Sequence, residues 1–306
     1  MPKNRKRSSP GGIAGRILTA LTGLALIVTL LLRGKNIALF NSKGTIAHEQ
    51  RDLIILTMGI LFAIAIPTLI LFFFTAWKYR ESNSGASRAS SNRHSKLLVP
   101  GIWFIPCAVA IVLAMIMWPA AHRLDPKKMI AADSKPLTIQ VVSMRWKWVF
   151  IYPEQHIATV NFVQIPIHTP VHFELTADEA PMSSFWIPNL GGQLYSMTGH
   201  MNQLNLMGDT PGDYTGSSAE INGTGFSGMK FTTRVGSKDA FDVWVRGVNL
   251  SGHALDAAEY DRLLKPSQNN ADTFYWLAEN DLYDKVLMKY MGHDDDMHMM
   301  NMGRPE

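Results

Sequence analysis

Two uninterrupted apolar runs constrain this chain more than any other feature. Residues 53–77 form a run of 25 and residues 97–118 a run of 22, and neither contains a formally charged side chain. A helix needs about 20 apolar residues to cross about 30 Å of hydrocarbon. Both runs are therefore predicted to be transmembrane helices of one hairpin, over residues 37–122. The prolines inside them are compatible with this, because neighbouring helices can satisfy the carbonyls that a proline frees.

The charges around these runs predict the orientation of the hairpin. The polar linker between them, "KYRESNSGASRASSNRHSK", carries five Lys and Arg residues, which favours the cytoplasmic side. Residues 17–32 form a shorter apolar stretch of 16 behind the basic stretch "KNRKR". Residues 1–36 are thus predicted to be either a cleaved signal peptide or an uncleaved signal anchor. Either alternative predicts a multi-pass protein of a bacterial inner membrane, with everything after about residue 120 in the periplasm.

Composition excludes two kinds of chemistry. The chain has a single cysteine, Cys107, so it can form neither an internal disulfide nor a pair of thiolate metal ligands. The basic residues flank the apolar runs, which indicates membrane topology and not a nucleic-acid partner.

The second half of the chain has the pattern of a soluble β domain. Short segments rich in β-branched and aromatic residues alternate with Pro, Gly, Asp and Asn, which is typical of a β-sandwich. We predict such a domain over residues 125–248. Its expected strands are "LTIQVVS", "WKWVFIY", "ATVNFV", "VHFELT", "MNQLNLM", "MKFTTRV" and "FDVWVR".

The pattern turns helical over residues 249–292. Asn280 is placed to cap a helix that runs to Tyr290. Leu282, Val286 and Tyr290 share one face of this helix, which predicts core packing and not a cofactor site.

Several longer motifs resemble one family. They are "RDLI", "AWKYR", "MRWKWVFIYPEQHIATVNF", "SSFWIPNLGGQ" and "GFSGMKF". Together they resemble subunit II of the haem-copper respiratory oxidases. The resemblance implies an α+β membrane protein in which a two-helix transmembrane hairpin precedes a cupredoxin-like β-sandwich and short C-terminal helices.

The same resemblance implies where a dinuclear copper centre would lie, and its ligands are missing. In the cytochrome c oxidases of the family the centre is held by two histidines, two cysteines, a methionine and a glutamate carbonyl. Glu220 and Met229 match that set. The positions of the other four ligands are occupied here by Ser183, Ser218, Asn222 and Phe226. Because thiolate and imidazole supply most of the affinity for copper, no metal is expected at this loop. The substitutions resemble the ubiquinol oxidase branch of cytochrome bo type.

The branch implies the non-catalytic subunit II of a proton-pumping terminal ubiquinol oxidase, without a catalytic or cofactor-binding residue of its own. None of the ten histidines is expected within the two long helices, where haem ligands would have to lie, so haems and copper are expected on subunit I. Subunits III and IV and membrane lipid are the other expected partners, and ubiquinol is the expected substrate of the complex.

Val99 occupies the position at which many relatives have a glutamate at a proton-channel entrance. In copper-bearing relatives the aromatic residues at Trp146 and Trp148 accept electrons, but without copper we interpret them as packing. The residues expected to be structural are Trp146, Trp148, Trp186, Pro188, Gly216 and Gly223.

Two alternatives stay open. The tail, residues 293–306, mixes Met, His and Asp. It is either a solvated tail or a weak copper ligand. In the second case the chain could be a membrane-tethered periplasmic module that delivers copper. A cytochrome c oxidase subunit II is the other alternative, and the four missing ligands disfavour it.

Overall fold

The computed structural model describes residues 37–80, 98–250 and 253–290, together with Gly23, Leu26 and Leu30. The predicted signal or anchor, most of the linker with His94, and the tail lie outside these ranges. The chain divides into two compact units, Met1–Asn41 and Ser42–Glu306. The helices and strands named below all belong to the second unit.

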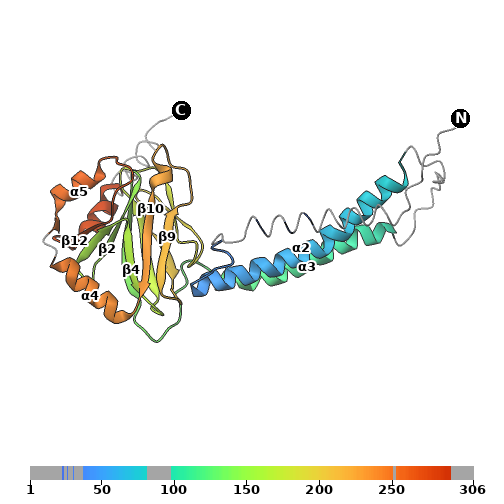
Figure 1. The fold of residues 1–306 in the computed structure, drawn as a ribbon, viewed down its shortest axis with the longest axis horizontal. Helices are drawn as coiled ribbons and strands as arrows, with labels where there is room; N and C mark the ends of the chain where they lie inside the picture. The colour runs from blue at the N-terminus through green and yellow to red at the C-terminus, as the bar shows by residue number, and fades with distance from the viewer. Residues whose placement is uncertain are drawn as a thin grey trace, which may run out of the picture. The chain divides into compact units, whose positions relative to one another are not determined.

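Two helices are long and apolar enough to cross a membrane (Figure 1). α2 spans Thr45–Lys78 and α3 spans Leu98–Arg123. Their apolar stretches have mean hydropathies of 2.6 and 2.3, and none of that surface is buried within the described chain. The prediction of a membrane-anchored hairpin is confirmed in this respect.

α2 begins before its apolar run because its first turn is bonded to loops of the sandwich. The hydroxyl of Thr45 donates to both carboxylate oxygens of Asp209 at 3.0 and 3.1 Å. The N–H of Ala47 donates to the carbonyl of Leu190 at 3.1 Å. The expectation that no histidine lies within the two helices is wrong, because these bounds include His48 near the start of α2 and His122 near the end of α3. Both lie outside the apolar runs.

Within the described residues, twelve strands form two facing sheets, so the predicted sandwich is confirmed. The larger sheet has the order β11-β12-β3-β2-β1-β5-β8 and the smaller the order β4-β10-β9-β6-β7. In the larger sheet the strands are β1 (Leu137–Met144), β2 (Lys147–Tyr152), β3 (Ile157–Val160), β5 (Val171–Ala177), β8 (Asn202–Leu206), β11 (Ala254–Leu255) and β12 (Thr273–Leu277). In the smaller sheet they are β4 (Phe162–Pro166), β6 (Ser183–Trp186), β7 (Leu194–Ser196), β9 (Gly212–Ser218) and β10 (Lys230–Gly236).

Aromatic side chains fill the space between the sheets. Trp148 and Phe150 of β2 are fully buried against Phe185 of β6 and Phe231 of β10. The rings of Phe185 and Phe231 stack at a centroid distance of 5.2 Å. The expectation that Trp148 is a packing residue therefore agrees with its place in this core.

The expected strand "ATVNFV" is two strands. Asn161 adopts a left-handed conformation with φ of 56° and separates β3 from β4, so that the chain passes from one sheet to the other. Asparagine tolerates this conformation better than most residues. Its side chain also holds the corner, since its Oδ1 accepts the backbone N–H of Trp148 at 2.9 Å.

The expectation that "FDVWVR" forms a strand is wrong. It lies in helix α4, Lys238–Asn249. The hydroxyl of Ser237 caps the helix by accepting the N–H of Ala240 at 3.2 Å. Phe241 and Val248 are buried seven residues apart, which is a helical spacing that the local alternation of "DVWV" conceals.

The C-terminal region is not purely helical. It contains α5 (Ala257–Leu264) and a last helix over residues 282–290, but β11 and β12 join the larger sheet (Figure 1). The last helix begins one residue later than predicted, because the carbonyl of Asp281 accepts the N–H of Lys285 at 3.0 Å. Asn280 instead pairs with the Nδ1 of His156 at 2.9 Å.

Candidate functional site

Most of the positions that correspond to copper ligands lie together. β6 carries Ser183 and β9 ends at Ser218, and the loop of residues 219–229 follows. The side-chain amide of Asn222 donates to the hydroxyl of Ser183 at 2.8 Å and lies 3.1 Å from the sulfur of Met229. The loop therefore brings side chains from β6, its own middle and its end into one cluster.

Ser218 forms two hydrogen bonds with the loop that follows it. The hydroxyl of Ser218 donates to the backbone carbonyl of Glu220 at 3.0 Å, and the Ser218 N–H donates to the carbonyl of Met229 at 3.3 Å. Phe226 lies half-buried in a short 3₁₀ turn, Phe226–Gly228, and no polar contact can come from its ring.

The chemistry of this cluster does not fit a dinuclear copper centre. Hydroxyl and amide groups stand where thiolates and imidazoles would be needed, and only a thioether and a carbonyl remain. The polar groups instead bond to one another across a site in which Ser183, Ser218 and Met229 are buried. The cluster of Ser183, Ser218, Glu220, Asn222 and Met229 is called the serine–asparagine cluster below.

Trp146 packs against the glycines of the loop. It lies in the turn between β1 and β2, not in a strand as expected, and its φ is 65°. A bulky residue in this conformation is a true outlier, held in place by its surroundings. A Cβ on Gly225 would lie 2.3 Å from the ring of Trp146, and one on Gly223 would lie 3.3 Å from it. Gly223 also has a φ of 120°, so glycine is required there for two reasons.

The remaining predicted structural residues also lie near the cluster. Gly216 is buried in β9, and a Cβ there would lie 2.1 Å from the ring of Phe231. Trp186 ends β6 with 36% of its surface exposed, and Pro188 is half-buried in the following loop. Val99 is the second residue of α3 and is not part of the sandwich.

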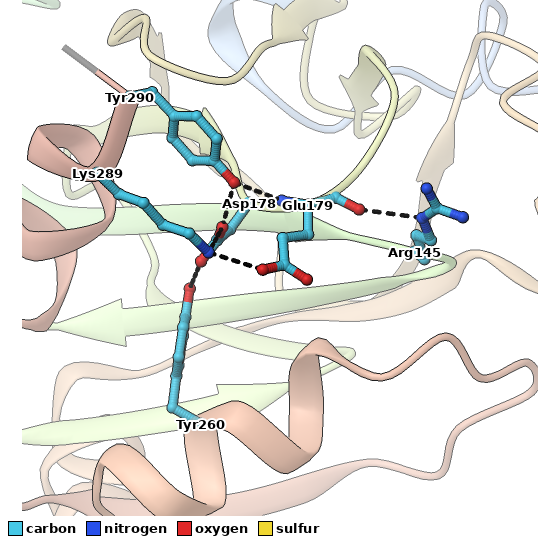
Figure 2. Close-up of polar contacts among 6 residues, drawn as sticks. All are labelled: Arg145, Asp178, Glu179, Tyr260, Lys289 and Tyr290. Atoms are coloured by element: carbon cyan, nitrogen blue, oxygen red, sulfur yellow. Dashed lines mark hydrogen bonds and ion pairs between the residues drawn. The ribbon is translucent and has the colours of Figure 1, made fainter. Parts of the chain in front are cut away.

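A buried carboxylate at the end of β5 has no signal of its own in the sequence (Figure 2). Asp178 is only 1% exposed and follows β5 directly. It accepts hydrogen bonds from the hydroxyls of Tyr260 at 2.9 Å and Tyr290 at 2.6 Å, and from the ammonium of Lys289 at 3.0 Å. Tyr260 comes from α5 and the other two come from the last helix. Asp178 thus joins both C-terminal helices to the sandwich.

Glu179 extends this cluster to the turn that packs against the loop of residues 219–229, which is called the copper-type loop below. Its carboxylate pairs with Lys289 at 2.9 Å, and its N–H donates to the hydroxyl of Tyr290 at 3.0 Å. Its carbonyl accepts the Nε of Arg145 at 3.0 Å, as Figure 2 shows. Arg145 directly precedes Trp146, so the Asp178 cluster continues into the turn that supports the loop.

The ionisation of this cluster favours neutral tyrosines and a charged lysine. Burial, with the carboxylate of Asp178, raises the pKa of Tyr260 and of Tyr290 above the usual range. Burial alone would lower the pKa of Lys289, but the carboxylates of Glu179 and Asp178 outweigh it and raise that pKa. The donors that hold Asp178 therefore stay protonated at neutral pH.

A cavity of about 920 Å³ opens between the two clusters. Its walls come from the β1–β2 turn, the segment after β5, the copper-type loop and the C-terminal helices. The lining residues are Arg145, Trp146, Glu179, Ala180, Pro181, Thr198, Asn222, Gly223, Thr224, Leu264, Pro266 and Tyr290.

Comparison with known proteins agrees with this architecture. The family model for the periplasmic domain of cytochrome c oxidase subunit II matches residues 155–235. The model for the COX aromatic-rich motif matches residues 250–294, which include Tyr260, Lys289 and Tyr290.

Relatives of known name match nearly the whole chain. The cytochrome bo(3) ubiquinol oxidase subunit 2 of Pseudomonas putida is 42% identical over 92% of this chain and 87% of its own length. The protein of the same name from Pseudomonas aeruginosa is 41% identical over 90% of this chain and 83% of its own length. The ubiquinol oxidase subunit 2 of Acetobacter aceti is 40% identical, over 85% of each chain. This chain belongs to the family of ubiquinol oxidase subunit 2.

Proposed function

We propose that this chain is the redox-inactive subunit II of a terminal oxidase that passes electrons from ubiquinol to oxygen. The observation that carries the proposal is the serine–asparagine cluster, in which polar side chains bond to one another where copper ligands would be needed. A complex that takes electrons from a lipid-soluble quinol needs no copper centre on a periplasmic domain.

The proposal assigns the chemistry to a partner. Subunit I would hold the haems and copper and react with ubiquinol and oxygen, while this chain would hold none of them. α2 and α3 expose large apolar side chains along most of their length, which suits both packing against subunit I and contact with lipid. Subunits III and IV are proposed as further partners, in a bacterial inner membrane with the sandwich in the periplasm.

Oxygen consumption by the purified complex tests this function. The complex that contains this chain is supplied in turn with a reduced short-chain ubiquinol and with reduced cytochrome c. We expect rapid turnover with the quinol and none above background with cytochrome c. Turnover with cytochrome c at a comparable rate would contradict the proposal, because an entry site for that donor would then have to exist.

A further inference from the structure

The end of α3 that leads into the sandwich carries three basic residues close together. Arg123 ends the helix, and Lys127 and Lys128 follow in a turn. Basic residues beside a membrane helix usually mark the cytoplasmic side, and the linker between α2 and α3 is predicted to have that role. The three residues lie at the other end of α3 from this linker, so membrane topology does not account for them.

The length of α3 places these residues at the level of lipid headgroups. The apolar run of residues 97–118 contains 22 residues. At 1.5 Å per residue it is about 33 Å long, close to the roughly 30 Å of a hydrocarbon core. Arg123 then lies about 7.5 Å beyond Trp118 along the helix axis. Because a headgroup layer is about 5–7 Å thick, the basic residues belong to that layer and its outer edge.

The sandwich holds the turn of residues 125–128 in place. The carbonyl of Pro126 accepts the backbone N–H and the side-chain amide of Asn205 in β8, each at 3.0 Å. Within the turn, the N–H of Lys127 donates to the carboxylate of Asp125 at 2.9 Å, and the N–H of Lys128 donates to its carbonyl at 3.0 Å. The backbone is thus fixed, while both lysine side chains stay exposed.

Neither of these lysines has an ion-pair partner among the described residues. The nearby carboxylates have other contacts, because Asp125 accepts the backbone N–H of Lys127 and Glu49 pairs with the Nε of Arg123 at 2.7 Å. Three basic side chains therefore stand against two carboxylates. We call Arg123, Lys127 and Lys128 the basic turn.

An exposed apolar stripe on α3 leads up to the basic turn. Ile111, Met115 and Trp118 share one helical face and are 59%, 62% and 73% exposed. His122 continues this face, with its ring 4.9 Å from the indole and its Nδ1 2.8 Å from the carbonyl of Trp118. An indole at this depth is typical of a membrane interface. The apolar stripe of Ile111, Met115 and Trp118 therefore faces the chains of a lipid whose headgroup lies at the basic turn.

An anionic phospholipid has the chemistry that both parts require. Its acyl chains are apolar, and its phosphodiester supplies negative oxygens that bind ammonium and guanidinium groups. A free phosphate would use the charges but not the apolar stripe. A zwitterionic phospholipid brings a cation beside its phosphate, which the lysines repel.

We propose that the apolar stripe and the basic turn bind an anionic phospholipid in the leaflet on the sandwich side. The phosphate contacts Lys127 and Lys128, and one acyl chain lies along the apolar stripe. The lipid thus fills the angle between α3 and the segment that leads to β1. This inference rests on the membrane anchoring of the chain and goes beyond the proposed role in quinol oxidation.

Photo-crosslinking of lipid to the purified complex tests the site. The complex that contains this chain is placed in phosphatidylcholine nanodiscs with a trace of phosphatidylglycerol or phosphatidylcholine that carries a diazirine on one acyl chain. Lipid adducts on residues 111–122 are then quantified by mass spectrometry. We expect at least threefold more adducts from the phosphatidylglycerol probe. Equal labelling by the two probes, or no labelling because a partner subunit covers the stripe, would overturn the proposal.

Charge variants test whether the basic turn causes the preference. Lys127→Gln combined with Lys128→Gln should bring the ratio of the two probes close to one, whereas the corresponding pair of changes to arginine should preserve it. Lys238→Gln combined with Lys285→Gln removes two exposed lysines from α4 and the last helix and is the matched control. An unchanged ratio in the first glutamine variant, or an equal fall in the control, would contradict the assignment.

A soluble headgroup distinguishes a lipid site from a simple phosphate site. Glycerophosphoglycerol, which lacks acyl chains, is added in large excess and compared with sodium chloride at the same ionic strength, since salt alone screens the charges. We expect the soluble headgroup to lower the labelling less than twofold relative to the salt control. If it abolished the preference, the basic turn would be a phosphate site without a role for the apolar stripe, and the lipid assignment would be wrong.

Discussion

Removing the carboxylate of Asp178 should release the C-terminal helices from the sandwich. Asp178→Ala leaves the hydroxyls of Tyr260 and Tyr290 without their acceptor and leaves Lys289 with Glu179 only. Hydrogen bonds to a charged group contribute about 1.5–3 kcal/mol each, but they are not additive. The hydroxyls of Tyr260 and Tyr290 each lose an acceptor, at about 1–3 kcal/mol apiece. Lys289 is 42% exposed and keeps Glu179, so it adds little, and we expect a total loss of about 3 kcal/mol.

Glu179→Ala is the matched control. It removes a carboxylate that bonds to the same lysine, but its side chain is 55% exposed and the pair is screened by solvent. An exposed ion pair contributes about 0–1 kcal/mol. The structure therefore predicts a large difference between two adjacent carboxylates that share one partner.

Hydrogen exchange of residues 282–290, followed by mass spectrometry in the full-length chain, measures this difference locally. A loss of about 3 kcal/mol corresponds to roughly 100-fold faster exchange, because 1.4 kcal/mol is tenfold. Glu179→Ala should change the rate less than about fivefold. If both variants accelerated exchange equally, or if Asp178→Ala had no effect, the assigned anchoring role of Asp178 would be refuted.

Three further predictions concern the loop and the cluster. Gly216→Ala should destabilise the chain by about 1–3 kcal/mol in thermal unfolding, because its Cβ would overlap the rigid ring of Phe231. Gly247 lies in α4, and a Cβ added there would have no neighbouring atom within 4 Å, so Gly247→Ala should be neutral or stabilising by up to about 1 kcal/mol. If Gly247→Ala were the more destabilising of the two, the packing of Gly216 against Phe231 would be refuted. Stability should fall as pH rises above about 10, since unfolded Lys289 and Tyr290 lose protons that the folded state retains. Tyr290→Phe should flatten this slope between pH 8 and 11 in unfolding midpoints, and an unchanged slope would exclude Tyr290 as a contributor. Restoring all four ligand types should give a coloured copper centre, and a colourless protein after copper loading would contradict the alignment of the loop; the variant combines Ser183→His, Ser218→Cys, Asn222→Cys and Phe226→His.

The elements with a strong local pattern could be predicted from the sequence. The two apolar runs exceed the length that a bilayer requires. β10 alternates between buried and less buried residues, whereas β2, β3 and β4 are buried along their whole length and are indicated by their β-branched and aromatic residues. α4 was misread because "DVWV" alternates over four residues, whereas its burial repeats over seven. Only packing against the sheets decides whether this segment forms a strand, with a period of two, or a helix.

The Asp178 cluster could not be found in this way. Asp178 lies at the end of an ordinary strand, and its partners Tyr260, Lys289 and Tyr290 are 82, 111 and 112 residues away. The predicted core packing is right for Leu282 and Val286, but Tyr290 is half-buried and bonds to Asp178 through its hydroxyl. Long-range hydrogen bonds of this kind leave no periodic signal in the sequence.

The loop of residues 219–229 has the connections that a metal would otherwise supply. A copper centre would link β6 to the loop through its ligands, and here the Asn222 amide links Ser183 of β6 to Met229 at the end of the loop. Trp146 also packs against Gly223 and Gly225 of the loop. The shape therefore depends on packing and hydrogen bonds within the sandwich. For that reason the loop can keep its form in a chain whose side chains do not fit copper.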